Sequence, residues 1–268
     1  MLNRLRTFLL ISLLLSVNCS KHNTVDTRLT ADMPQKIVWA WERPEDLRFL
    51  DPTKFGVAFL AQTLLLENDS VRHKPRRQPL EVSPDTYMIA VTRIETNKES
   101  GKHASFDEAM VQKTSRLIEN TLTLPDVKAI QIDFDAAVSE RRFYRELLLE
   151  LKYRLDMPAE INAQTTTPVP ITMTSLASWC TGDAWFNDFP VAEAVPMVFQ
   201  MGADSEKIKT YLRNGNDWNE PLCRGSYGIS LDENLDVQLK PGRRVYYFNS
   251  SSWLPNDLRA LTGQNRER

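Results

Sequence analysis

Polar side chains recur at every second position in one short apolar stretch of the chain. Gln131, Asp133 and Asp135 alternate with the apolar residues Ile130, Ile132 and Phe134. Successive side chains of a β-strand point to opposite faces, so the three polar groups are expected to share one face. Burying acids on such a face is unfavourable unless a cation pairs with them or a ligand or reaction requires them. The stretch is therefore the first candidate for a functional site.

Three interpretations of these acids stay open. A structural salt bridge with Arg93, on a neighbouring strand, would neutralise them. Alternatively, Asp133 and Asp135 form a ligand-binding or catalytic pair. Glycoside hydrolysis needs one carboxyl group to protonate the leaving oxygen and another, ionised, to attack carbon or activate water. A divalent cation held by the two aspartates is a further alternative.

The elements that position these acids follow from the rest of the chain. Apolar strand-like runs alternate with helical patterns, which predicts an α/β fold: a single-domain (β/α)8 TIM-like barrel of near-minimal size. A doubly wound sheet and a truncated barrel are the alternatives. The eight predicted strands are Lys36–Trp41, Gly56–Leu60, Tyr87–Ile94, Ala129–Phe134, Ile171–Leu176, Ala194–Gln200, Tyr227–Leu231 and Arg244–Phe248.

Helices are expected between several of these strands. Ser139 has the side chain of a helix N-cap, because its hydroxyl can accept from a free backbone N–H. The first crossover has room only for a short helix. The predicted helices are Phe106–Leu122, Ser139–Leu155, Ser205–Leu212, Asn256–Leu261 and the short Pro44–Leu50.

Active sites of barrel enzymes form at the carboxyl ends of the strands, which turns the strand ends into a list of candidates. The predicted catalytic carboxylates are Asp133, Asp135, Asp232 and Glu233. Tryptophans at the ends offer apolar faces for sugar rings, although core packing is the alternative for each of them. The predicted substrate-binding residues are Trp41, Glu42, Arg93, Glu95, Gln131, Trp179, Gln200 and Trp253.

Several blocks of the chain resemble the signature of one bacterial exported family, catalogued only as a domain of unknown function. The resemblance spans nearly the whole mature chain and implies an exported, barrel-like protein, but no activity. The blocks are Val38–Leu47, Val91–Glu95, Gln131–Ala136 with Ser139–Arg141, Ser175–Cys180 and Glu193–Met197.

A weaker resemblance is to barrel glycosidases. The segment from Gln131 to Asp135 is similar to the chitinase pattern of alternating aspartates that ends in a catalytic glutamate. Here Ala137 stands where that family has its glutamate, and Glu140 comes later, in an expected helical turn. Other barrel glycosidases place one carboxylate at strand four and another at strand seven, a layout that Asp135 with Asp232 or Glu233 would follow.

The N-terminus has the parts of an export signal. Arg4 and Arg6 precede a short apolar stretch that ends near Cys19. The stretch is too short to span a bilayer, which takes about 20 apolar residues. We expect a signal peptide at 1–18, a polar tether at 19–34 and the barrel at 35–268. Lipidation of Cys19 would anchor the protein to a membrane, in the periplasm or at the cell surface.

The composition and motifs of the chain argue against several other classes of protein. The chain has 33 Lys and Arg against 35 Asp and Glu, and it lacks the basic cluster typical of nucleic-acid binding. No cofactor or metal is predicted, because there is no glycine-rich phosphate loop and the three histidines lack ligand spacing. Cys180 and Cys223 either form a disulfide, as an oxidising compartment permits, or stay buried thiols.

Together these patterns predict an exported glycoside hydrolase-like barrel that acts on or binds a carbohydrate through a carboxylate-lined cleft. The alternative is a non-catalytic carbohydrate- or envelope-binding lipoprotein. In both, the expected partners are a carbohydrate or cell-envelope polymer and a membrane, reached through the lipid anchor. The substrate, the stereochemical outcome and the oligomeric state do not follow from the sequence.

Overall fold

Eight parallel strands close into a barrel, as the sequence predicted. The computed structural model describes residues 30–157, 168–183 and 185–262. Around the barrel the strands follow the order β1, β3, β6, β7, β8, β9, β10 and β11, and the pairing of β1 with β3 closes the ring. The barrel strands are Lys36–Ala40, Phe55–Glu67, Tyr87–Thr96, Val127–Asp133, Ile171–Leu176, Glu193–Met197, Ser226–Ser230 and Arg244–Phe248.

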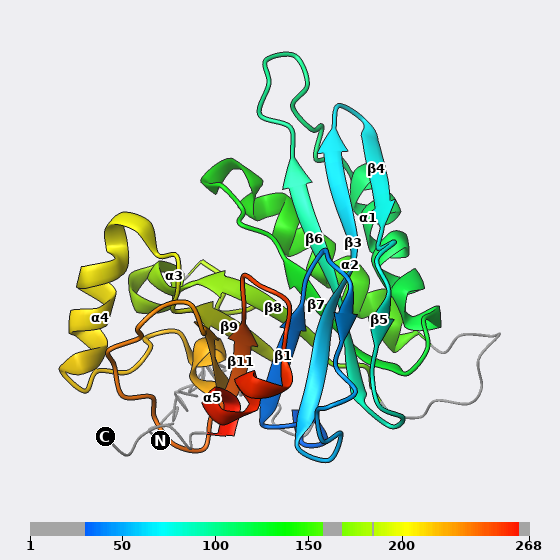
Figure 1. The fold of residues 1–268 in the computed structure, drawn as a ribbon. Helices are drawn as coiled ribbons and strands as arrows, with labels where there is room; N and C mark the ends of the chain where they lie inside the picture. The colour runs from blue at the N-terminus through cyan, green and yellow to red at the C-terminus, as the bar shows by residue number, and fades with distance from the viewer. Residues whose placement is uncertain (1–29, 158–167, 184, 263–268) are drawn as a thin grey trace, which may run out of the picture.

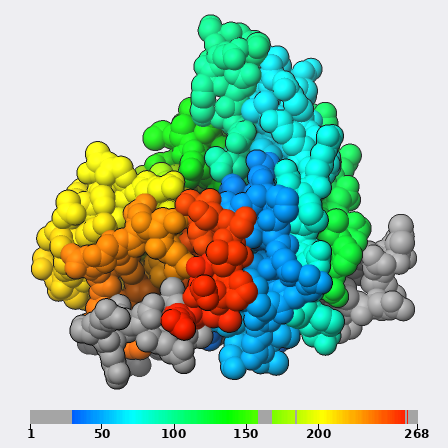
Figure 2. Space-filling model, viewed as in Figure 1, coloured from blue at the N-terminus to red at the C-terminus, as the bar shows by residue number. Residues whose placement is uncertain are grey.

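The longest strand, β3, extends well beyond the predicted Gly56–Leu60. Its second half pairs antiparallel with β4 (Ser70–Pro75) and forms a hairpin outside the ring. Figure 2 shows this hairpin and the neighbouring 97–107 segment standing above the rest of the surface. The short strands β2 (Glu45–Asp46) and β5 (Leu80–Glu81) pair with each other. The first connections of the barrel therefore use β-structure in place of helices.

Helices cover the barrel unevenly (Figure 1). Four α-helices lie between consecutive strands from β6 to β10, and α5 follows β11. The connections β1–β3, β3–β6 and β10–β11, all within the described residues, contain no α-helix. The helices are α1 (Glu108–Glu119), α2 (Arg141–Asp156), α3 (Ala177–Gly182), α4 (Ser205–Arg213) and α5 (Leu258–Thr262), with 3-10 turns at Asn120–Thr123, Val138–Glu140, Gly202–Asp204, Pro221–Gly225 and Pro255–Asp257.

Two local predictions were wrong. The segment Pro44–Leu50 is not helical, because the backbone N–H groups of Glu45 and Leu47 bond to the carbonyl groups of Pro79 and Glu81. Pairing with residues 79–81 replaces the hydrogen bonds that a helix would make. Ser139 does not cap α2.

The N-terminal side of α2 is organised by Glu140. A 3-10 turn precedes the helix, and the carboxylate of Glu140 accepts from the backbone N–H of Ala137 at 2.7 Å. Glu140 is also the N-cap residue of α2 by position. The N-cap position of α2 therefore lies one residue after Ser139, and no side chain caps the helix there, because the Glu140 carboxylate bonds back to the start of the 3-10 turn.

The interior of the barrel is layered. Near its amino-terminal end, the buried Glu193 is bound by Arg244 at 2.6 Å and by the Tyr246 hydroxyl at 2.6 Å. Above this layer, the Trp39 indole N–H donates to the Gln131 side-chain oxygen at 2.7 Å. Gly228 leaves room for the Trp39 ring, since a Cβ on Gly228 would lie 2.8 Å from it.

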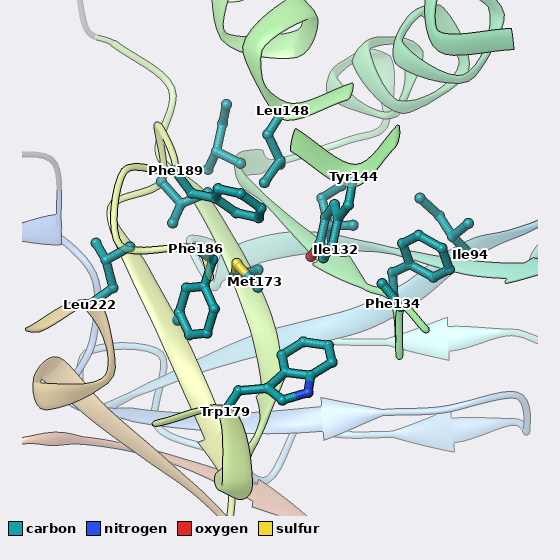
Figure 3. Close-up of a cluster of buried hydrophobic side chains, with 14 of the residues drawn as sticks. Ile94, Ile132, Phe134, Tyr144, Leu148, Met173, Trp179, Phe186, Phe189 and Leu222 are labelled. Carbon is teal, nitrogen blue, oxygen red and sulfur yellow. The ribbon is translucent and has the colours of Figure 1, made fainter. Parts of the chain in front are cut away.

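The main hydrophobic core lies outside the barrel, between the strands and the helices. Ile132 and Phe134 of the β7 region pack there with Tyr144 and Leu148 of α2 and with Met173 of β8 (Figure 3). The alternation predicted for this strand is confirmed, because the apolar residues face the helices and Gln131 faces the interior.

A disulfide between Cys180 and Cys223 joins α3 to the turn before β10. We expect the double variant Cys180→Ala/Cys223→Ala to lose about 4 kcal/mol of unfolding free energy, as a closed loop of 43 residues predicts. Urea unfolding followed by tryptophan fluorescence measures the loss. Equal stability of variant and parent, or alkylation of both thiols without reductant, would contradict the disulfide.

Candidate functional site

A cavity of about 290 Å³ opens at the carboxyl ends of the barrel strands. Its walls come from β1, β6, β7, β8, β9 and β11 and from the segments that follow them. This is the end at which barrel proteins place their active sites. The lining residues are Trp39, Trp41, Arg93, Asp133, Asp135, Thr174, Leu176, Ala177, Ser178, Met197, Phe199, Gln200, Met201, Asp204, Ile208 and Phe248.

Asp133 is the deepest acid of the cavity. Its relative exposure is 9%, and one carboxylate oxygen accepts from the Thr174 hydroxyl at 2.7 Å. Burial raises the pKa of Asp133 to about 6, the Thr174 hydrogen bond opposes this shift, and the nearby charge of Asp135 adds to it. A carboxyl group that holds its proton up to about pH 6 can act as a general acid near neutrality.

Asp135 lies just beyond the last residue of β7, at the cavity mouth. A hydrogen bond from the Ala136 N–H to the Phe134 carbonyl turns the backbone there, at 2.9 Å. The residue is exposed, yet the surrounding walls remove enough water to raise the pKa of Asp135, while Arg93 lowers it. Both predicted aspartates therefore line one cavity, and both hold their protons more strongly than an aspartate in water.

The salt bridge between Arg93 and Asp133 is present but long, and Arg93 is bound more closely by another carboxylate. The closest nitrogen of Arg93 is 3.9 Å from the Asp133 carboxylate, whereas the Arg93 Nε donates to Glu95 at 3.0 Å. The guanidinium also lies 5.9 Å from the centre of the Trp41 ring. Arg93 thus has its own partners, and Glu95 serves the site by holding Arg93.

Aromatic side chains form the cavity wall opposite the aspartates. Phe199 and Phe248 stack with their ring centres 5.2 Å apart, and Trp41 meets Phe248 edge-on at 6.3 Å. Trp39 lies 6.2 Å from Phe199 and forms the floor with its indole bonded to Gln131. Trp41 was predicted here, and Gln131 supports the floor from below.

Several lining residues were not predicted from the sequence. Phe248 follows Tyr246 by two positions on β11, and Thr174 follows Thr172 by two on β8, so the alternation that found Asp133 also indicates them. Asp204 was missed because it lies beyond the end of β9, in the turn before α4, where no strand pattern predicts its direction.

Two of the predicted tryptophans belong to the core. Trp179 is 6% exposed and packs edge-on against Trp185 at 5.0 Å, and Figure 3 shows it with the hydrophobic cluster of the α2 side. Trp253 is 3% exposed and donates its indole N–H to the Trp39 carbonyl. Neither lines the cavity, so core packing, the alternative considered for each tryptophan, describes both.

The two carboxylates that follow β10, the seventh strand of the barrel, also lie outside the cavity. Asp232 accepts from the Ser250 backbone N–H at 2.7 Å, and this hydrogen bond lowers its pKa. Glu233 accepts from the backbone N–H of Gln200, which does line the cavity, at 2.9 Å. Asp232 therefore ties two loops together, and Glu233 positions Gln200. Glu42 is exposed and outside the cavity wall.

Glu140 does not supply the missing glutamate of the chitinase pattern. Burial alone would raise the pKa of Glu140, but hydrogen bonds from Lys98, Thr96 and the Ala137 backbone outweigh burial and lower it. With its acceptor positions taken, Glu140 stays ionised and fixes the start of α2. Asp133, Asp135 and Asp204 are the carboxylates that line the cavity.

Among the described residues, no three His, Cys, Asp or Glu side chains gather closely enough to hold a metal ion. No helix in the described ranges has the length and apolar character to cross a membrane. The predicted signal peptide, Cys19 and residues 19–29 of the tether lie outside these ranges.

Comparison with known proteins does not assign the chain. No family model, no curated protein and no solved structure matches it. The interpretation of the site therefore depends on its own geometry and charge.

The raised pKa of Asp133 predicts how the free energy of unfolding depends on pH. An aspartate in an unfolded chain loses its proton near pH 3.8, whereas Asp133 in the folded protein keeps it up to about pH 6. The folded state binds more protons between these values, so the parent loses stability as pH rises through that window. Asp133→Asn carries no charge, and we expect it to exceed the parent by about 1–3 kcal/mol at pH 7 but to be nearly equal to it at pH 4.

Urea unfolding of both proteins at the two pH values measures this difference. Asp126→Asn is the matched control, because Asp126 is exposed and precedes β7 at the opposite end of the barrel. Its positive φ of 59° also suits asparagine. A variant at position 133 that is less stable than the parent at pH 7 would show that the Asp133 carboxylate is stabilised, not strained, by its site.

Proposed function

We propose that this chain is an exported glycoside hydrolase-like protein that binds a carbohydrate in the cavity and hydrolyses it with Asp133 and Asp135. One observation carries the proposal: a buried carboxyl group with a pKa of about 6 stands beside a second carboxyl group in a cavity with aromatic walls. Two carboxyl groups in different environments are what glycoside hydrolysis requires.

The roles follow from the environments of the two acids. Asp133, deeper and more strongly protonated, donates its proton to the leaving glycosidic oxygen as the bond to the anomeric carbon breaks. Asp135, at the solvent-facing mouth, accepts a proton from the water that attacks that carbon. One water is consumed, and exchange with solvent restores the two protonation states. Trp41 and Phe248 line the cavity and offer apolar surface to a sugar ring.

The second candidate is a non-catalytic carbohydrate- or envelope-binding lipoprotein. It is favoured by the absence of a third acid on the strand: Ala137 replaces the glutamate of the chitinase pattern, and Glu140 is engaged at the start of α2. Asp232 also stands outside the cavity, so the strand-seven partner of other barrel glycosidases is missing from its wall. In this candidate the same cavity binds without turnover.

Turnover of a panel of α- and β-linked oligosaccharides and peptidoglycan fragments distinguishes the two. We expect Asp133→Asn and Asp135→Asn to lower kcat by about 10²- to 10⁴-fold, as loss of a general acid or base does, with binding largely kept. Asp126→Asn and Glu108→Gln, both exposed and away from the cavity, should match the parent. Binding without turnover in the parent would favour the lipoprotein candidate. Unchanged turnover in both cavity variants would remove the aspartates from the mechanism.

Export with lipidation belongs to the same proposal. The Arg-flanked apolar stretch and the cysteine at its end predict cleavage before Cys19 and acylation of its thiol and new amino group. Mass spectrometry of the mature N-terminal peptide is expected to show this modification, and Cys19→Ala should lose it and leave the membrane fraction. A mature chain that starts elsewhere without lipid would contradict the anchor while leaving export intact.

A further inference from the structure

The cavity walls carry an excess of negative charge. Three of the lining residues are aspartates, Asp133, Asp135 and Asp204, and Arg93 is the single basic residue among them in the described part of the chain. The charge of Arg93 is balanced by Glu95, which accepts from its Nε at 3.0 Å. Arg93 also offsets part of the charge of Asp133 and Asp135, but one arginine that is shared with Glu95 cannot balance three lining aspartates.

The carboxylates also have free acceptor capacity. Asp133 uses one oxygen for the Thr174 hydroxyl, while the other oxygen is 3.9 Å from its nearest cation, too far for a hydrogen bond. Asp133 is more than nine-tenths buried and lines the cavity. The side chains of Asp135 and Asp204 make no hydrogen bond to other described residues, and Asp204 does not cap α4 although it stands at the N-cap position. The site thus offers several carboxylate acceptors that no described side chain fills with a hydrogen bond.

Like the carboxylates, the aromatic wall favours a positively charged ligand. The faces of aromatic rings attract cations, and most strongly those of tryptophan. Trp41 already has the Arg93 guanidinium 5.9 Å from its ring centre. Trp39, Phe199 and Phe248 complete the wall. Aromatic rings and carboxylates around one space are the combination with which proteins bind ammonium groups, because the rings replace water without neutralising the carboxylates.

We propose that the ligand carries a free ammonium group, and that it is an amino sugar whose nitrogen is not acylated. The ammonium group pairs with a carboxylate of the cavity wall, which Asp133, Asp135 and Asp204 make negative, and the sugar ring packs on the aromatic wall. The carbohydrate part of this inference rests on the proposed function, whereas the charge of the ligand follows from the cavity alone. At about 290 Å³ the cavity is at the small end of ligand sites, so it fits about one sugar residue of a chain.

Three matched oligosaccharides test the inference by titration calorimetry at pH 6.5 and low salt. They share linkage and length, and they carry at the second carbon a free amine, an acetylated amine or a hydroxyl group. A small alkylammonium compound without a sugar is the fourth probe. We expect the free-amine oligosaccharide to bind about tenfold or more tightly than the other two, and to lose this preference as salt rises.

Asp204→Asn should reduce the preference for the free amine while leaving the weak binding of the hydroxyl oligosaccharide unchanged, because Asp204 acts through its charge. Asp126→Asn should keep the full preference, since Asp126 is at the other end of the barrel. Circular dichroism and the unfolding midpoint establish that both variants are folded.

The outcomes separate the two proposals. Equal or weaker binding of the free-amine oligosaccharide relative to the hydroxyl one overturns the inference and leaves the carbohydrate function standing. Binding of the alkylammonium compound with none of the oligosaccharides supports the charge preference and overturns the carbohydrate function. Failure of all four probes to bind overturns both.

Discussion

The hydrogen bond between the Trp39 indole and the Gln131 amide is the interaction on which the site depends. It joins β1 to β7 across the barrel interior at 2.7 Å, and the amide N–H₂ of Gln131 continues to the Thr172 hydroxyl on β8 at 3.2 Å. Gly228 on β10 makes the space that the indole ring occupies. Because the Trp39 ring is the floor of the cavity, four strands fix the depth of the site before any of its acids is considered.

This floor explains why Asp133 is strained. Two residues along β7 from Gln131, its side chain must stand directly above the packed layer, where few waters can reach it. Burial then dominates its pKa, and a single hydroxyl partner opposes it only in part. Functional sites commonly retain such groups at the expense of stability, so a site that raises the free energy of its own ionised form is better explained by a ligand than by folding.

The part of the fold that sequence predicted is the part that periodicity encodes. All eight barrel strands were identified, because each combines an apolar run with nearby turn signals. The extension of β3 was missed because its second half, Ala61–Glu67, continues the apolar run and becomes an antiparallel hairpin through contacts that no local pattern shows.

The candidate site was predicted to the same extent and for the same reason. Asp133 and Asp135 were found by alternation on a strand. Trp179 and Trp253 were misplaced because position near a strand end does not decide whether a large ring turns toward the cavity or into the core. Asp204 lies on a turn after β9, and its place in the wall depends on how the chain leaves the barrel.

The barrel holds a second buried carboxylate that shows what Asp133 lacks. Glu193, 2% exposed near the other end of the interior, receives the Arg244 guanidinium and the Tyr246 hydroxyl, each at 2.6 Å. Arg244 also donates to the Pro34 carbonyl at 2.9 Å, so this ion pair ties the first described residues to the barrel. One fold thus pairs a buried acid fully where only structure is needed. At the carboxyl end of the barrel it leaves Asp133 with a hydroxyl partner and a distant arginine, and the unfilled acceptor lines the cavity.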